Sequence, residues 1–176
     1  MAKDQETIEV EPVLVDAHSK TLFDRVSDYL TDKDWNFSSF PEKDYFSCIL
    51  RLEHGTSRVL IEAVESSAWS RVLVYCTYPN FVPLNRRPEV LEAINRINYS
   101  MIRGCFEMDM RDGEVRVRVN LESDTYVSEP MIDRALRSAL DLANLFQAAL
   151  LAIAFGNTSA ENILELVDRG ENSTLQ

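Results

Sequence analysis

The two carboxylates best placed for acid–base chemistry are Glu107 and Asp109, which stand two residues apart in a strand-like run. Residues two apart in a strand point to the same side, so the pair has the arrangement that a general acid and a general base would need. Arg116 and Arg118 follow with the same spacing in the next strand-like run. Carboxylates that face arginines across a hairpin form a solvent-exposed ladder of ion pairs, and we favour this interpretation over a catalytic pair.

Histidine, cysteine and glycine patterns also argue against enzyme chemistry. The only histidines are His18 and His54, and neither stands at a metal-binding spacing from another ligand residue. Cys48, Cys76 and Cys105 are far apart in strand-like runs, which is typical of buried, reduced thiols. The five glycines do not cluster into a phosphate-binding loop, and no G-x-S-x-G motif is present. The sequence therefore predicts a protein that is not an enzyme, with no catalytic residue, no metal site and no cofactor.

Binding is the remaining kind of activity, and its candidates are apolar side chains in and near a proline-punctuated loop. The loop from Tyr78 to Leu84 contains several large apolar side chains, which would form either a docking loop or a lid packed over the end of the sheet. The candidate partner-binding residues are Trp69, Tyr78, Phe81, Val82 and Leu84.

The alternative function is a small-ligand sensor. Its pocket would lie between the sheet and the helices, lined by residues such as Trp69, Tyr75, Met108 and Met110. Such pockets are mostly apolar and hold a few polar groups, which fits these side chains.

Composition bounds these possibilities. The chain has 176 residues, of which 45% are hydrophobic and 27% are charged, and its formal net charge is −11. This predicts one soluble domain without the broad basic surface that nucleic acid or an anionic membrane requires. Residues 1–12 read as an acidic flexible arm rather than a signal peptide, because they lack an apolar core. The longest apolar run, 135–155, is interrupted by polar residues, so we expect a cytoplasmic protein that does not span a membrane.

Hydrophobic periodicity predicts an α+β fold with an antiparallel sheet of about five strands. The expected order is helix, three strands, helix, two strands, helix, helix. The expected helices are 19–32, 88–103, 129–155 and one after Thr158, and the expected strands are 45–53, 57–65, 69–78, 106–110 and 115–121. Residues 35–44 read as a connection. In the strand 57–65 the inward face is ambiguous, because Val59 and Ile61 compete with Leu60 and Val64.

The long helix raises a separate question, since its last part, 145–155, is apolar nearly all round. A helix of this kind must be covered on several sides. Either a neighbouring element of the same chain supplies the cover or a second subunit does.

The stretch from Pro88 to Leu121 carries the strongest local signals. Gly104 follows the helix and is predicted to end it in a left-handed backbone conformation. Asn98 is predicted to be a buried amide whose hydrogen bonds join the helix to neighbouring backbone. Asp112-Gly113 predicts a two-residue type I′ hairpin turn, which would pair Met110 with Val115.

This stretch resembles the YbjN family. The matching residues are Ile97-Asn98, Gly104, Phe106, Asp109 and Asp112 to Val115, and the resemblance covers about 22–150. The family is described as bacterial sensory-transduction regulators, and its fold is similar to that of type III secretion chaperones. The resemblance implies helices packed on one face of the sheet, a protein-binding role, often as a dimer, and no catalytic residues.

We therefore expect a single YbjN-like α+β domain over 13–170, followed by a frayed tail at 171–176. Its expected function is that of a non-enzymatic protein-binding module, either a chaperone-like adaptor or a signalling regulator. The expected partner is a protein segment, with a homodimer as a further possibility. Asn98, Gly104, Asp112 and Gly113 are expected to serve the architecture rather than the site.

Overall fold

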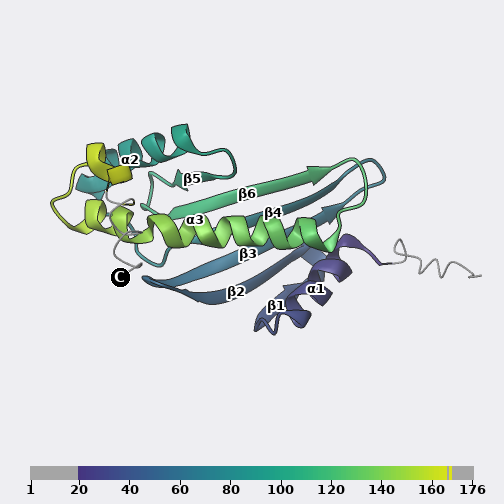
Figure 1. The fold of residues 1–176 in the computed structure, drawn as a ribbon. Helices are drawn as coiled ribbons and strands as arrows, with labels where there is room; N and C mark the ends of the chain where they lie inside the picture. The colour runs from purple at the N-terminus through teal and green to yellow at the C-terminus, as the bar shows by residue number, and fades with distance from the viewer. Residues whose placement is uncertain (1–19, 166, 168–176) are drawn as a thin grey trace, which may run out of the picture.

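A computed structural model describes residues 20–165 and residue 167. The predicted acidic arm and frayed tail lie outside these described residues. The elements, shown in Figure 1, are α1 (Leu22–Asp32), β1 (Phe37–Phe40), η1 (Pro41–Lys43), β2 (Tyr45–Leu52), β3 (Gly55–Glu65), β4 (Ser70–Thr77), η2 (Leu84–Arg86), α2 (Arg87–Ser100), β5 (Cys105–Met108), β6 (Val115–Ser123), α3 (Glu129–Phe155) and η3 (Ala160–Asn162).

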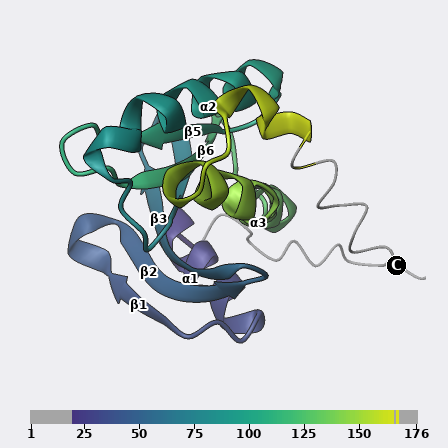
Figure 2. The same cartoon turned by 90° about the vertical axis from the view of Figure 1, so that its left-hand side faces the viewer.

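One antiparallel sheet organises the molecule, with the strand order β1-β2-β3-β4-β6-β5. The sheet curves around α3, and α1 lies against the same face (Figure 2). Helix α2 packs against β5 and α3 at one edge. The predicted α+β class, the antiparallel sheet and the helices on one face are confirmed.

The sheet has six strands where the sequence predicted about five. The additional strand is β1, which pairs with β2 so that Phe37 lies opposite Cys48. We predicted a connection over 35–44 because the four residues of β1 read apolar, polar, polar, apolar, which does not follow the period of two. Its pairing with β2, rather than its own pattern, makes it a strand.

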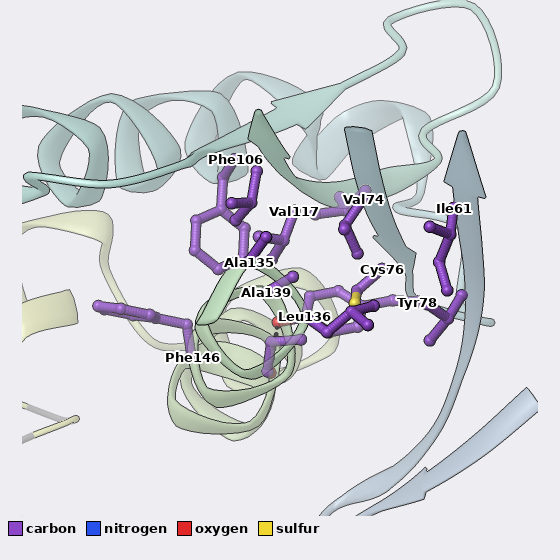
Figure 3. Close-up of a cluster of buried hydrophobic side chains, with 14 of the residues drawn as sticks. Ile61, Val74, Cys76, Tyr78, Phe106, Val117, Ala135, Leu136, Ala139 and Phe146 are labelled. Carbon is purple, nitrogen blue, oxygen red and sulfur yellow. Dashed lines mark hydrogen bonds between the residues drawn. The ribbon is translucent and has the colours of Figure 1, made fainter. Parts of the chain in front are cut away.

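The core lies between α3 and the inner face of the sheet (Figure 3). Ile61, Val74 and Val117 project from three adjacent strands and are buried against small residues of α3 such as Ala139. The Tyr78 hydroxyl donates to the Ala143 carbonyl at 2.7 Å, which joins the end of β4 to the middle of α3. Alanines let the helix approach the sheet closely, so these contacts fix the helix against the strands.

Two of the three cysteines belong to this core, as the sequence predicted. Burial raises the pKa of the Cys48 thiol to about 11 and that of the Cys76 thiol to about 12, so both are protonated at neutral pH. Cys105 differs, because it is only partly buried and points to the other face of the sheet.

Helix α3 has the predicted bounds. By length and hydropathy alone it could cross a membrane, but here it is the central helix of the domain, packed on β4 and β6. Part of its apolar end is covered within the chain: Ile153 and Ala154 are buried, and so are Ala160 and Ile163 of the following segment, whereas Phe155 is 54% exposed. The intramolecular interpretation of the all-round apolar end is thus correct for these residues.

The segment after α3 starts differently from the prediction. Ser159, rather than Thr158, accepts from the Glu161 N–H, and a 3₁₀ turn precedes the helical residues 163–165. Arg86 donates to the Ile153 carbonyl at 2.6 Å and so satisfies the end of α3. The Ala160 N–H donates to Glu89 of α2 at 2.7 Å, which holds the segment against that helix.

The β5–β6 hairpin shows the largest error of the sequence analysis. Val115 pairs with Met108, whereas a two-residue loop would pair it with Met110. The loop is longer, and it is closed by a hydrogen bond in which the Asp109 N–H donates to the Glu114 carbonyl at 2.9 Å. Gly113 has a φ of +87° but Asp112 does not have a positive φ, which excludes the type I′ turn. Because the register is displaced by two residues rather than one, the residues that remain in β5 and β6 keep the same sides of the sheet, while Met110 moves into the loop.

Local hydrogen bonds and contacts from outside the hairpin together hold the longer loop. Within it, the Asp109 and Asp112 carboxylates accept from the N–H groups two residues further on. The Arg87 guanidinium donates to the carbonyls of Met110, Arg111 and Asp112 at 2.8 to 3.2 Å. The Val82 N–H donates to the Gly113 carbonyl at 2.9 Å, and a Cβ on Gly113 would lie 2.3 Å from the Val82 carbonyl. The hairpin tip is therefore held open by the loop beside it.

Candidate protein-interaction surface

The outer face of the sheet is the side away from α3, and the described elements leave it uncovered. Strand register places three rows of side chains across it. One row runs Ile49, Arg58, Thr77, Arg116 and Glu107; the next runs Ser47, Leu60, Tyr75, Arg118 and Cys105; the third runs Tyr45, Glu62, Leu73 and Asn120. Of the outward residues on the six strands, only Thr77 is buried.

The middle of this face is apolar. Leu60 and Tyr75 are directly opposite each other, and Leu73 is on the same strand as Tyr75. All three are partly exposed, and Ile49 at one side is 72% exposed. Contiguous apolar side chains on an open sheet face, rimmed by charges, are a feature of interaction surfaces.

The charge of the outer face is opposite to that of the chain. Its strands carry five outward arginines and three outward glutamates, while the whole chain has a net charge of −11. The arginines are Arg51, Arg58, Arg71, Arg116 and Arg118, and the glutamates are Glu62, Glu107 and Glu122. The strands of this face thus carry an excess of positive charge, which is reduced where Arg58 pairs with Glu114 beside β6 at 3.3 Å.

Two of these arginines stack on aromatic rings. The Arg116 guanidinium lies 4.3 Å from the centre of the Tyr75 ring, and that of Arg71 lies 5.4 Å from the Trp69 ring. Stacking of this kind holds each guanidinium against the sheet. The apolar residues and the arginines therefore form one continuous surface.

Glu107 and Asp109 do not form an acid–base pair. Glu107 accepts from Arg116 at 2.8 Å and from Arg118 at 3.0 Å. The two-residue turn would have placed Asp109 opposite Arg116, but in the longer loop Asp109 contacts Arg111 at 2.6 Å. The side-chain hydrogen bond from Arg111 lowers the pKa of the Asp109 carboxyl to about 2. Both carboxylates are thus paired with arginines.

Asn98 closes the free edge of the sheet at β5. Its Nδ2 donates to the Phe106 carbonyl at 3.0 Å and its Oδ1 accepts from the Phe106 N–H at 2.8 Å. The predicted tie between the helix and neighbouring backbone is confirmed. One amide thereby makes the two hydrogen bonds that another strand would make at this position, which disfavours pairing of a partner strand with β5.

Gly104 lies beside this edge, and its predicted left-handed conformation is also confirmed, with a φ of +70°. A Cβ there would lie 2.9 Å from the Arg118 carbonyl. Helix α2 ends at Ser100, four residues earlier than Gly104, so the glycine turns the chain into β5 rather than ending the helix directly.

The five candidate partner-binding residues do not form one site. Tyr78 and Val82 are buried, while Phe81 and Leu84 are 54% and 74% exposed. Trp69 precedes β4 and Tyr78 follows it, so they lie at opposite ends of that strand. The loop therefore serves in part as the packed lid that was the alternative interpretation, and it also supports the hairpin tip.

The four residues suggested as the lining of a sensor pocket are also separated. Tyr75 points to the outer face, away from the helices, and Met110 is 47% exposed in the hairpin loop. A surface hollow of about 540 Å³ does contain Met108 and Met110, but acidic and basic side chains complete its lining. The predicted apolar pocket between sheet and helices is not formed by these residues.

Among the described residues, no three His, Cys, Asp or Glu side chains gather as metal ligands.

Four residues of the outer face were not predicted from the sequence to bind a partner: Leu60, Leu73, Arg71 and Arg118. For Leu60 the sequence did contain a signal. The strand 57–65 is apolar on both sides, because one side faces the core and the other is the apolar outer face.

Comparisons with known proteins agree on the architecture. The crystal structure of YbjN from E. coli, described as "a putative transcription regulator", is similar with a TM-score of 0.52 over 69% of this chain and 85% of that chain. At 13% sequence identity this similarity concerns the fold alone. No curated protein matches the sequence. The model of the YbjN family, "Putative bacterial sensory transduction regulator", matches residues 22–152, and the chain therefore belongs to the YbjN family.

Proposed function

We propose that this protein is a regulatory adaptor that binds a segment of a partner protein on the outer face of its sheet. Membership of the YbjN family supports the regulator or adaptor role. The observation that carries the binding part is the apolar centre formed by Leu60, Leu73 and Tyr75, which is bordered by arginines on an otherwise acidic chain. The proposal assigns no catalytic step.

Site-specific photo-crosslinking tests this function. A photoreactive phenylalanine analogue replaces Tyr75 on the outer face or, as a control, Arg134 on the exposed side of α3. We expect discrete crosslinked partners in native lysate from position 75 and none of the same mass from position 134.

A second variant links capture to the surface itself. Leu60→Glu places a carboxylate in the apolar centre without changing the core, because Leu60 points outward. It should abolish capture while the melting temperature remains near that of the natural protein. Capture that survives this change, or crosslinks that arise only from position 134, would contradict the proposal.

Cytoplasmic localisation, a chaperone-like action and a dimeric state stay predictions. Cell fractionation tests the first, and light scattering at micromolar concentration tests the last.

A further inference from the structure

A hollow of about 370 Å³ opens on the outer face between β4, β6 and β5. Register explains its shape, because Leu73 lies opposite Asn120 and Arg118 lies opposite Cys105. Its lining residues are Arg71, Leu73, Gly104, Cys105, Arg118, Asn120 and Glu122. The hollow thus has an apolar residue, an amide and two guanidinium groups around one space.

The two arginines of the hollow are incompletely paired. The Arg71 Nε is buried and has no hydrogen-bond partner among the described residues, and its Nη2 lies 3.9 Å from Glu62. Arg118 shares the carboxylate of Glu107 with Arg116, and its Nη2 donates to the Cys105 Sγ at 3.5 Å, a weak acceptor that a carboxylate could replace. The buried Nε is out of reach of solvent, but the Arg71 side chain as a whole is 36% exposed, so its Nη groups can donate to an added carboxylate.

We propose that this hollow receives a carboxylate side chain of an acidic partner segment, whose apolar neighbours pack on Leu60, Leu73 and Tyr75. The inference rests on the proposed function, since it specifies what the outer face binds. Charge complementarity selects this occupant: the face is positive and the surrounding chain is acidic. A second copy would instead set the same arginines against each other.

Nucleic acid is disfavoured by the same residues. Glu122 lies in the hollow and Glu107 beside it, so a phosphate backbone that followed the face would meet carboxylates as well as arginines. A side-chain carboxylate needs only the space between Arg71 and Arg118.

Cys105 provides a reporter within the hollow. Its thiol is partly exposed, whereas Cys48 and Cys76 are 5% and 0% exposed. Iodoacetamide should therefore alkylate Cys105 first, and a bound segment should slow that reaction. Mass spectrometry of the intact full-length protein measures the rate.

The probe is a capped ten-residue peptide that alternates glutamate and leucine, and the matched control peptide carries glutamine in place of glutamate. At ten times its Kd, the acidic peptide should slow alkylation about tenfold. Arg71→Gln should weaken this peptide about tenfold or more, because it removes a charge-assisted pair. Arg134→Gln, which removes the same charge from the exposed side of α3, should leave the affinity unchanged.

The outcomes separate the two proposals. Equal protection by the glutamine peptide, or protection by a 20-base-pair DNA duplex instead of the peptide, would overturn the acidic-segment inference. So would unchanged peptide affinity in Arg71→Gln. If no probe protects Cys105 while crosslinking from position 75 still captures a partner, the inference fails and the proposed function stands. If both experiments are negative, both fail.

Discussion

The two faces of the sheet are made from the same strands and have opposite properties. On β3, Ile61 is 0% exposed beneath α3, and its neighbour Leu60 is partly exposed on the outer face. Helices cover the centre of the inner face, so the side chains there stabilise the fold. The outer face retains apolar side chains that contribute little to the fold, which is why we place partner binding there.

The largest expected effect tests this contrast between adjacent residues. Ile61→Ala should lower the free energy of unfolding by about 2–5 kcal/mol, because it leaves a cavity under α3. Leu60→Ala should cost less than about 1 kcal/mol, since its environment is partly solvent. Urea denaturation followed by circular dichroism measures both. If the two variants lose the same free energy of unfolding, the outer face is buried like the inner one and the two faces do not differ.

A smaller effect is expected at the β5 edge, where the two faces meet. Asn98→Leu should cost about 1–3 kcal/mol, because the Phe106 N–H and carbonyl lose both partners. Asn95→Leu is the matched control, as Asn95 is an exposed residue of the same helix. If the two variants are equally stable in denaturant, the Asn98 hydrogen bonds do not stabilise the edge.

The smallest effect is expected at Glu65, the last residue of β3, where the inner face ends. Partial burial acts to raise the pKa of the Glu65 carboxyl, but the Leu22 N–H and the Arg25 guanidinium together outweigh it, so the pKa lies below the ordinary 4.5. A lowered folded-state pKa stabilises the protein above the unfolded value, and this contribution disappears as the pH falls through the folded value.

Glu65→Gln should therefore cost less than about 1 kcal/mol at pH 7, because solvent screens the carboxylate. The difference from the natural protein should vanish on acidification below pH 4.5. Melting temperatures of both proteins between pH 3 and pH 7 give this comparison. A difference that grows toward acid pH would show that the carboxylate does not stabilise α1.

Local sequence signals predicted the elements that are long or periodic. Helix α3 has its predicted bounds because Ser128, Pro130 and Gly156 mark its ends and a 27-residue pattern lies between them. Strand β1 has four residues and no alternation, so only its pairing partner defines it. The Asp112-Gly113 signal was misleading because local hydrogen bonds, together with Arg87 and Val82 from other segments, hold a longer loop.

The candidate site was harder to predict for a related reason. An open sheet face is defined by what does not pack on it, and a single strand cannot show this. The sequence of β3 indicated two apolar sides, but only the position of α3 decides which side is the core. The arginines became a group only when β4, β6 and β5 were placed side by side.

The position of α3 in the sequence also matters during synthesis. All six strands precede Glu129, so a ribosome completes the whole sheet before it makes the helix that covers the inner face. Until then, residues such as Ile61, Val74 and Val117 have no helix α3 to pack against. A nascent chain with an exposed apolar sheet is a substrate for general chaperones. Premature termination anywhere before α3 would therefore yield an aggregation-prone fragment rather than a smaller folded domain.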